Sequence, residues 1–385
     1  MLKDDFQSIP IALITGYLGA GKTTLLNHIL KDPKGHKVAV IVNDIGEINI
    51  DADLISKTGA VKEVDNSLVP LQNGCICCTL KNDLMEQIGE LVQAGTFDYI
   101  IIEASGVCEP IPIAQTIAQM SDMTASRGLP EICHLDNIIS VVDANRLAFE
   151  FNCGSDFVEK KEQYAEEEDI QSLLIQQMEF ANVIVLNKAE LVNEEQKKEI
   201  KAVIHALCPE AKIIEASYGE VDLDELIDTD NFDFEKAYFN EGWVKALNEE
   251  EEHDEGEAYE YGIDTFVYYS RKPFVMDKLE ELANRWPDSV IRTKGFLWFE
   301  NDPKYLYVFE QAGRQITTGR DSIWICECEP EIQAREIAAD PSLKEIWDDK
   351  YGDRENKIVF IGQNMDRQGI IDAMDACTTD DFVQD

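Results

Sequence analysis

The segment Gly16-Tyr-Leu-Gly-Ala-Gly-Lys22-Thr23 follows an apolar run and precedes a helical one, and its residue types suit phosphate binding. Glycines let backbone N–H groups approach phosphate oxygens, and the first turn of a helix adds a favourable dipole. In this pattern Lys22 reaches the β- and γ-phosphates of a nucleotide, and the Thr23 hydroxyl binds Mg²⁺. The alternative is a glycine-rich turn that binds nothing. We predict a phosphate cradle whose nucleotide-binding residues are Gly16, Gly19, Ala20, Gly21, Lys22, Thr23 and Thr24.

A second element of phosphate chemistry is the apolar run 99–102, which ends in Glu103 and is followed by Ala, Ser and Gly106. Phosphoryl transfer to water needs a further partner for Mg²⁺ or for the attacking water, and a group that senses the γ-phosphate. Glu103 suits the first role, and the N–H of Gly106 suits the second. The predicted catalytic residues are therefore Lys22, Glu103 and Gly106, against the alternative that the strand merely ends in Glu.

Base recognition is predicted at Asn187, Lys188 and Glu190, which follow another apolar run. Asn-Lys-x-Asp is the guanine-reading pattern, in which the Asp carboxylate accepts two hydrogen bonds from the base. Here the acidic residue is Glu190, one methylene longer, so the same bidentate contact requires the loop to shift slightly. We predict a preference for GTP, with relaxed base specificity or an ordinary strand-to-helix turn as alternatives.

The segment Gly74-Cys-Ile-Cys-Cys78 places three of the ten cysteines within four residues. Thiolates are soft anionic ligands that hold Zn²⁺ or Cu⁺ well. Three of them leave a tetrahedral shell one ligand short, which suits a metal that is handed on better than a structural zinc. A disulfide between such close cysteines would be strained, and simple burial is unusual for so tight a cluster. We predict that Cys75, Cys77 and Cys78 bind a transferred metal.

The remaining thiols are expected to have structural roles. Cys326 and Cys328 alternate along an expected strand, which would turn both thiols to one side, and we expect them to be buried. His253 lies inside an acidic run and is expected to be solvated. The other cysteines are expected to be packing residues, and they are Cys108, Cys133, Cys153, Cys208 and Cys377.

Alternating apolar and amphipathic runs over the first ~230 residues predict an α/β fold. The expected strands are nearly continuous in apolar residues, as strands buried on both faces must be. They are 9–15, 38–43, 99–104, 138–143, 183–187 and 213–216, with helices at 23–30, 84–94 and 194–207. The prediction is a P-loop NTPase fold, a mostly parallel sheet with helices on both faces, over residues 1–235.

Composition then changes over residues 236–262, an acidic stretch with little apolar periodicity that we interpret as a linker. Beyond it we expect a smaller α+β domain, 263–385. Its expected strands are 265–269, 290–299, 305–310 and 357–361, and its expected helices are 275–285 and 366–376.

The net charge of −42 argues against nucleic acid and anionic membranes as partners, because no basic cluster offsets it. No apolar run approaches the about 20 residues that span a bilayer, and the start of the chain lacks the pattern of a signal peptide. We therefore expect a cytoplasmic protein. In such a compartment clustered cysteines are more often metal ligands or catalytic thiols than disulfides.

With these motifs in order, the chain resembles the CobW-like P-loop GTPases, relatives of UreG and HypB. The resemblance includes the cradle, Asn43-Asp-Ile-Gly-Glu47, the Gly-Cys-x-Cys-Cys motif, the strand ending at Glu103 and Asn187-Lys-Ala-Glu190. Lys294-Gly-Phe-Leu-Trp298, with residues 352–354 and 360–362, is similar to the C-terminal domain of that family.

The resemblance implies a metallochaperone that binds GTP, Mg²⁺ and a divalent metal, and delivers the metal to a client protein on hydrolysis. Zn²⁺ is the first expectation, with Co²⁺ or Fe²⁺ insertion as alternatives, and Glu47 is similar to a family position near the metal. Three departures stand out: Asp44 and Ile45 in the Glu47 loop, Glu190 in place of Asp, and an acidic rather than His-rich segment around His253.

Two hypotheses compete with a metallochaperone. A metabolite kinase would need an acceptor site, for which no residue set is evident, and a non-catalytic metal buffer would use the cradle only for stability. The oligomeric state is expected to be either a monomer or a dimer that depends on nucleotide or metal.

Overall fold

The computed structural model describes residues 8–42, 68–70, 81–125, 130–151, 153, 170–232, 261–340 and 343–380. The chain divides into two compact units, Met1–Glu241 and Gly242–Asp385. The predicted linker 236–262 lies outside the described residues except at its last two positions, so its boundaries stay a prediction. No helix in the described ranges is long and apolar enough to cross a membrane.

The first unit is built on a seven-stranded sheet with the strand order β3-β2-β4-β1-β5-β6-β7. Every recorded strand pair in this sheet is parallel. Its strands are β1 (Ile9–Thr15), β2 (Val38–Val42), β3 (Leu68–Pro70), β4 (Tyr99–Glu103), β5 (Cys133–Asp143), β6 (Val183–Asn187) and β7 (Lys212–Glu215). The described helices of this unit are α1 (Lys22–Lys31), α3 (Lys81–Ala94), α4 (Ile111–Ala125), α5 (Ala144–Glu150), α7 (Ile170–Glu179) and α8 (Glu194–Leu207).

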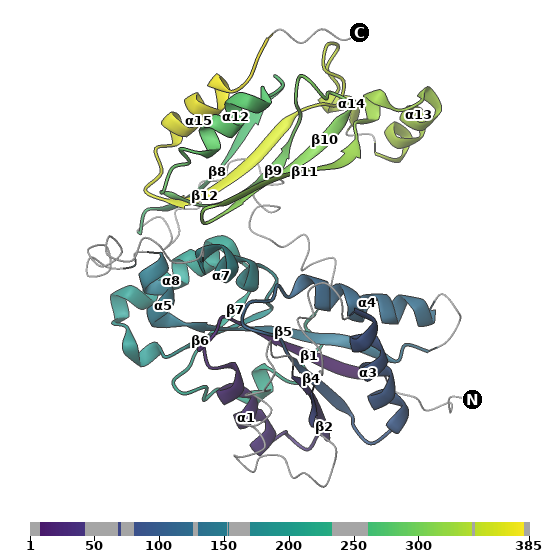
Figure 1. Cartoon of the computed structure of the whole chain (residues 1–385), viewed down its shortest axis with the longest axis vertical. Coiled ribbons are helices and arrows are strands. Elements are labelled where there is room, and N and C mark those ends of the chain that lie inside the picture. Colours follow the sequence, from purple (N-terminus) through teal and green to yellow (C-terminus); the bar gives the residue numbers. More distant parts are fainter. Residues whose placement is uncertain are drawn as a thin grey trace. The chain divides into compact units, whose positions relative to one another are not determined.

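Helices cover both faces of this sheet, as the fully apolar strands require. Figure 1 shows α1 on one side and α4, α7 and α8 on the other. On the α1 side, Leu25, Leu26 and Ile29 pack in one buried cluster with alternate residues of β1, β2, β4, β5 and β6. The predicted fold class and all six predicted strands are confirmed, although 138–143 is only the end of the longer strand β5.

The second unit contains a five-stranded sheet with the order β11-β10-β9-β12-β8, in which every recorded strand pair is antiparallel. Its strands are β8 (Ile263–Ser270), β9 (Val290–Leu297), β10 (Tyr305–Ala312), β11 (Gln315–Ile323) and β12 (Asn356–Gln363). The helices α12 (Met276–Ala283) and α15 (Arg367–Ala376) lie on one face of the sheet (Figure 1), and α13 (Pro330–Ala339) and α14 (Leu343–Ile346) follow β11 along the chain. Aromatic residues dominate the core between the sheet and α12 and α15.

The predicted strand at Cys326 and Cys328 is wrong. Residues Ile325–Glu327 form a 3-10 turn instead. The Asp353 carboxylate accepts hydrogen bonds from the backbone N–H groups of Ile325 and Cys326, both at 2.8 Å. In a strand these N–H groups would donate to a neighbouring strand. Because they donate to Asp353 instead, the segment forms a turn and does not join the sheet.

Candidate functional site: a phosphate cradle joined to a base-reading loop

The cradle connects the end of β1 to the start of α1 at the centre of the sheet. Its strand lies between β4 and β5, so the sheet order reverses at this point, where α/β proteins bind ligands beyond the carboxyl ends of the strands. Helix α1 begins after Gly21, which makes no side-chain cap. A helix start that is closed by glycine in this way, with its dipole facing the loop, suits an anion.

Lys22 lies within the cradle and is only 8% exposed. Its ammonium donates a hydrogen bond of 2.7 Å to the carbonyl of Gly16 and a longer one, 3.4 Å, to that of Tyr17. The lysine thus points back into the loop that carries it. Among the other predicted cradle residues, Gly16 and Ala20 are buried, whereas Gly19 and Thr24 are exposed.

At two positions only glycine fits, because another segment of the chain lies within contact distance of the backbone. At Gly21 the backbone has φ +109°, and a Cβ atom there would lie 2.3 Å from the Asn187 amide nitrogen. At Gly106 the backbone angle is ordinary, but a Cβ atom would lie 2.7 Å from the backbone nitrogen of Leu18. The turn after β4 and the base-reading loop therefore both pack directly against the cradle, and a larger residue would push them apart.

The two predicted Mg²⁺ partners are in direct contact. The Thr23 hydroxyl donates a hydrogen bond of 3.0 Å to Glu103, whose side chain is almost completely buried at the end of β4. Hydroxyl and carboxylate oxygens are the hard donors that Mg²⁺ prefers. The pair therefore fits this ion chemically.

Asn187 ties the base-reading loop to the cradle. Its side-chain amide donates a hydrogen bond of 2.8 Å to the carbonyl of Ala20, and its side-chain oxygen accepts one of 3.0 Å from the N–H of Gly219. Three segments far apart in the sequence are thus joined by one buried carboxamide. Asn187 is 2% exposed, so these contacts are made in the interior.

The other two predicted base-reading residues have partners that the sequence reasoning missed. Lys188 forms an ion pair of 2.6 Å with Asp143 at the end of β5, and Glu190 forms a side-chain hydrogen bond with Ser217. This bond is the main cause that lowers the pKa of the exposed Glu190 carboxyl, followed by its own backbone N–H. Asp143 could have been suspected because it ends a strand next to the one that ends at Asn187, but Ser217 carries no local signal.

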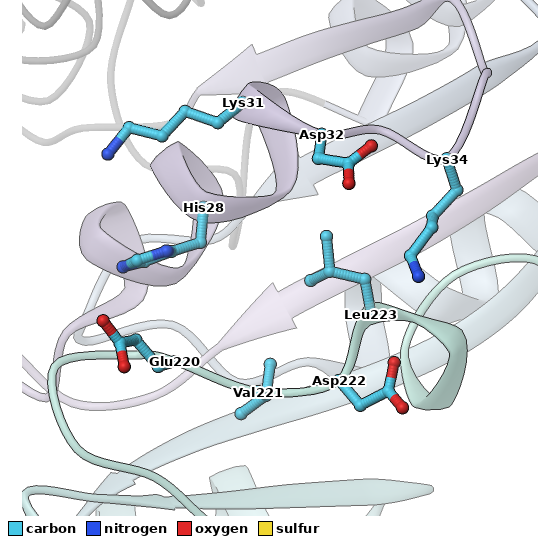
Figure 2. A pocket seen from close by; sticks show the side chains of 8 residues that line it. All are labelled: His28, Lys31, Asp32, Lys34, Glu220, Val221, Asp222 and Leu223. Atoms are coloured by element: carbon cyan, nitrogen blue, oxygen red, sulfur yellow. The ribbon is translucent and has the colours of Figure 1, made fainter.

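A surface pocket of about 380 Å³ lies between the C-terminal half of α1 and residues 220–223. Figure 2 shows the His28 imidazole and the Glu220 carboxylate pointing toward one another from its two walls. The first α1 residue that lines the pocket, His28, is six residues after Lys22, about 9 Å along the helix. The pocket is therefore separate from the phosphate cradle.

The predicted metal ligands Cys75, Cys77, Cys78 and Glu47 lie outside the described residues, as does His253. Within the described ranges no group of three His, Cys, Asp or Glu side chains could hold a metal ion. Cys326 and Cys328 are half-buried rather than fully buried, and burial, aided by Asp353, raises the pKa of the Cys326 thiol to about 12. The five cysteines predicted as packing residues are all buried.

Comparison with known families decides the relationship. Residues 10–215 match the family model described as CobW/HypB/UreG, nucleotide-binding domain, and residues 263–378 match that of the cobalamin synthesis protein cobW C-terminal domain. The chain belongs to the CobW/HypB/UreG family. In this CobW-type chain the first match runs from β1 to β7 and contains the cradle, Glu103 and the base-reading loop, and the second runs from β8 to α15.

Individual relatives of this CobW-type chain carry names that refer to zinc. It is 36% identical over 380 residues to the zinc-regulated GTPase metalloprotein activator 1 of Dictyostelium discoideum, covering 96% of this chain and 79% of that one. It is 31% identical to the zinc chaperone YjiA of Escherichia coli, covering 82% and 90% of the two chains. The crystal structure of Zn(II)-bound YjiA GTPase aligns over 97% of this chain and 100% of that one, with 22% identity and a TM-score of 0.44.

Proposed function

We propose that this chain is a GTP-hydrolysing metallochaperone that binds a divalent metal, Zn²⁺ first, through Cys75, Cys77 and Cys78 and delivers it to a client protein. The observation that carries the nucleotide half is the junction at Asn187, which holds the base-reading loop against the phosphate cradle. Membership of the family supports GTP hydrolysis, and the names of the zinc-related relatives support the metal half. The chain is a GTPase of the CobW type.

In this proposal the cradle residues exchange internal partners for the nucleotide. The Lys22 ammonium leaves the carbonyl of Gly16 and binds β- and γ-phosphate oxygens, which are stronger acceptors because they are charged. Thr23 and Glu103 would hold Mg²⁺, directly or through water, and the ion would supply positive charge to the phosphates when bound. Glu103 would also orient the attacking water, and the N–H of Gly106 would sense the γ-phosphate.

Guanine would be read by Glu190, whose carboxylate accepts hydrogen bonds from the N1–H and the 2-amino group of the base. The Ser217 hydroxyl steadies this carboxylate, which offsets the greater freedom of the longer side chain. Lys188, paired with Asp143, would take part in base recognition beside Glu190. GTP should therefore be preferred over ATP despite the substitution of Glu for Asp.

The metal half rests on the thiolate cluster. An incomplete shell of three thiolates suits a cargo metal, and Glu47 is the candidate fourth ligand. Co²⁺ or Fe²⁺ would fit the same proposal with a different client. A cytoplasmic location and a monomer, or a dimer formed with nucleotide or metal, stay predictions from the sequence.

The deciding experiment is a Zn²⁺ competition titration of the protein loaded with a non-hydrolysable GTP analogue or with GDP, beside the Cys77→Ala variant. We expect the two nucleotide states to differ in Zn²⁺ affinity by about five-fold or more, a usual size for coupling between sites. Cys77→Ala should abolish the tight site. The matched control is Cys133→Ala, because that thiol is fully buried in β5 and a metal ion in solution does not reach it.

Three results would count against the proposal. Equal Zn²⁺ affinity in the two nucleotide states would remove the coupling, and equal loss of zinc in Cys77→Ala and Cys133→Ala would remove the site. An absolute requirement for a small-molecule phosphate acceptor during GTP turnover would indicate a kinase. Lys22→Ala with unchanged metal transfer would indicate a metal buffer whose cradle has no part in delivery.

A further inference from the structure

A buried glutamine of α7 holds the turn that follows β4. The Gln177 side chain is 1% exposed, and its amide nitrogen donates hydrogen bonds to the carbonyls of Gly106, at 3.1 Å, and Cys108, at 3.2 Å. The turn itself is closed by the N–H of Cys108, which donates to the carbonyl of Ser105 at 3.0 Å. One carboxamide therefore uses both of its N–H bonds on a turn about 70 residues earlier in the chain.

This contact differs from ordinary packing. The neighbouring α7 residues Leu174, Ile175 and Met178 are buried and apolar, so a polar side chain among them costs free energy unless its groups are hydrogen-bonded. Within the described residues the side-chain oxygen of Gln177 has no hydrogen-bond partner. The free energy that compensates for burying this side chain therefore comes from the two hydrogen bonds of its amide nitrogen. A methionine of similar volume would fill the same space without that cost. The arrangement points to a role for the two hydrogen bonds themselves.

The bonds control how the Gly106 N–H is presented. The carbonyl of Ser105 is engaged with Cys108, and in a trans peptide the N–H on the other side of the same plane points the opposite way. Gln177 fixes the following peptide through the carbonyl of Gly106. Both planes flanking Gly106 are thus fixed, while no hydrogen bond joins its own N–H to another described residue. The same residue packs against Leu18 of the cradle.

We propose that Gln177 is a positioning residue of the γ-phosphate-sensing turn: it holds residues 105–108 so that the N–H of Gly106 is oriented toward the third phosphate before nucleotide binds. The proposal rests on the proposed function, because it takes Gly106 as the sensor. It adds that α7, the helix leading into the strand of the base-reading loop, sets the preference of the site for a triphosphate over a diphosphate. The affinity for GDP, which lacks the third phosphate, should not depend on Gln177.

The test compares Gln177→Met with Gln311→Met. Gln311 is a matched control because it is also fully buried and also donates to backbone carbonyls, but it lies in the second unit. Affinities for fluorescent GDP and for a non-hydrolysable GTP analogue are measured with kcat and KM for GTP and with the thermal midpoint. Gln177→Met should lower the preference for the GTP analogue over GDP and kcat each by about ten-fold, the worth of one or two hydrogen bonds. GDP affinity should stay within about two-fold, and Gln311→Met should leave every nucleotide parameter unchanged.

Gln177→Glu separates positioning from packing. A buried carboxyl has a raised pKa, so its protonated form gains population as the pH falls from 8 to 6. Only that form can donate a hydrogen bond to the turn. We expect kcat of Gln177→Glu, relative to the wild type, to rise as the pH falls, whereas that of Gln177→Met should not.

The possible results separate this inference from the proposed function. If the wild type neither hydrolyses GTP nor prefers the GTP analogue, the proposed function fails first. If the wild type does both, a folded Gln177→Met with an unchanged or increased preference for the GTP analogue overturns the inference alone. A Gln177→Met variant that loses GDP and GTP-analogue affinity equally would also overturn it, because that pattern marks general damage to the site.

Discussion

The contact between Glu190 and Ser217 shows how a single residue adapts the base-reading loop. A glutamate carries one more rotatable bond than the aspartate of the guanine-reading pattern, so its carboxylate is less confined. The Ser217 hydroxyl donates to it, and the charged form gains from that bond, which is why the pKa of Glu190 falls below its ordinary value. In the proposed function this bond keeps the carboxylate charged and oriented as a guanine acceptor.

Ser217→Ala should shift the pH dependence of guanine-nucleotide affinity. In the proposed function the deprotonated carboxylate accepts the base N–H groups, so affinity should be lost as the pH falls through the pKa of Glu190. Without Ser217 that pKa rises toward its ordinary value, and the loss should begin at higher pH. Fluorescent GDP titrations between about pH 4 and 6 would measure this. Identical pH profiles for the variant and the wild type would show that Ser217 does not act on Glu190.

Asp143 carries two roles that substitution can separate. One carboxylate oxygen pairs with Lys188, and the other accepts the N–H of Arg146 and caps α5. Asp143→Asn keeps a good cap but removes the ion pair, so nucleotide affinity should fall while stability is nearly kept. Asp143→Ala should lose both the ion pair and the cap, and the free energy of unfolding should fall by about 1 kcal/mol. Denaturation and GDP titration of both variants test this, and equal stability of the two would exclude the capping role.

Two helices of the first unit begin in contrasting ways. Helix α8 starts with a full capping box, in which Asn193 and Gln196 each bond the other's backbone N–H. Helix α1 starts at a left-handed glycine with no side-chain cap. The first arrangement is a side-chain cap, whereas the second is a strand-to-helix turn closed by glycine, the form that suits an anion in the proposed function.

Asn193→Ala should therefore affect stability and not binding. Loss of the box removes two hydrogen bonds at the start of α8, and we expect the free energy of unfolding to fall by about 1 kcal/mol. GDP affinity should stay within about two-fold, because the hydrogen bonds of Asn193 lead to Gln196 and Lys197 of α8 and to none of the cradle or base-reading residues that the structure describes. Chemical denaturation with and without GDP measures both quantities. A large loss of GDP affinity in a folded variant would contradict this separation.

At the scale of the whole molecule, each unit has its own core and its own buried polar anchor. The second unit is anchored by Arg354, which is fully buried, pairs with Glu327 and donates to the carbonyls of Pro303 and Tyr351. Its guanidinium also lies over the Trp298 ring, 5.4 Å from the ring centre. One side chain thus joins its own segment to residues 298–303 and to the turn at Glu327.

Arg354→Met should unfold the second unit more easily and leave nucleotide binding intact. Removing one partner of a buried ion pair is costly, and we expect a loss of about 3 kcal/mol from that unit. Calorimetry with GDP should show one transition that GDP raises and a second, lowered transition that it does not. The control Arg335→Met removes an exposed ion pair with Glu336 and should change little. A loss of GDP binding in Arg354→Met would show that the units do not fold independently.

The sequence by itself determined the features that depend on neighbouring residues. The cradle motif is a continuous run whose glycines, lysine and threonine lie in one strand-to-helix turn. The buried strands are predicted equally locally, by runs of apolar residues. The same local reading missed β11, since most of that strand is exposed and lacks apolar alternation. It also misassigned Cys326 and Cys328, because their turn depends on Asp353, which lies far along the chain.

The tertiary structure alone decided which distant groups meet. Asn187 with Gly219, Lys188 with Asp143, Glu190 with Ser217 and Gln177 with Gly106 are all contacts between loops or helices that the parallel sheet brings to one edge. A carboxamide or hydroxyl has no sequence period of its own, so nothing local marks its partner. The order of the strands decides that partner, because β1 lies between β4 and β5 and is separated by β4 from β2, the next strand along the chain. The motifs therefore predicted which residues could bind nucleotide and metal, and only the tertiary structure showed which distant side chains hold them in place.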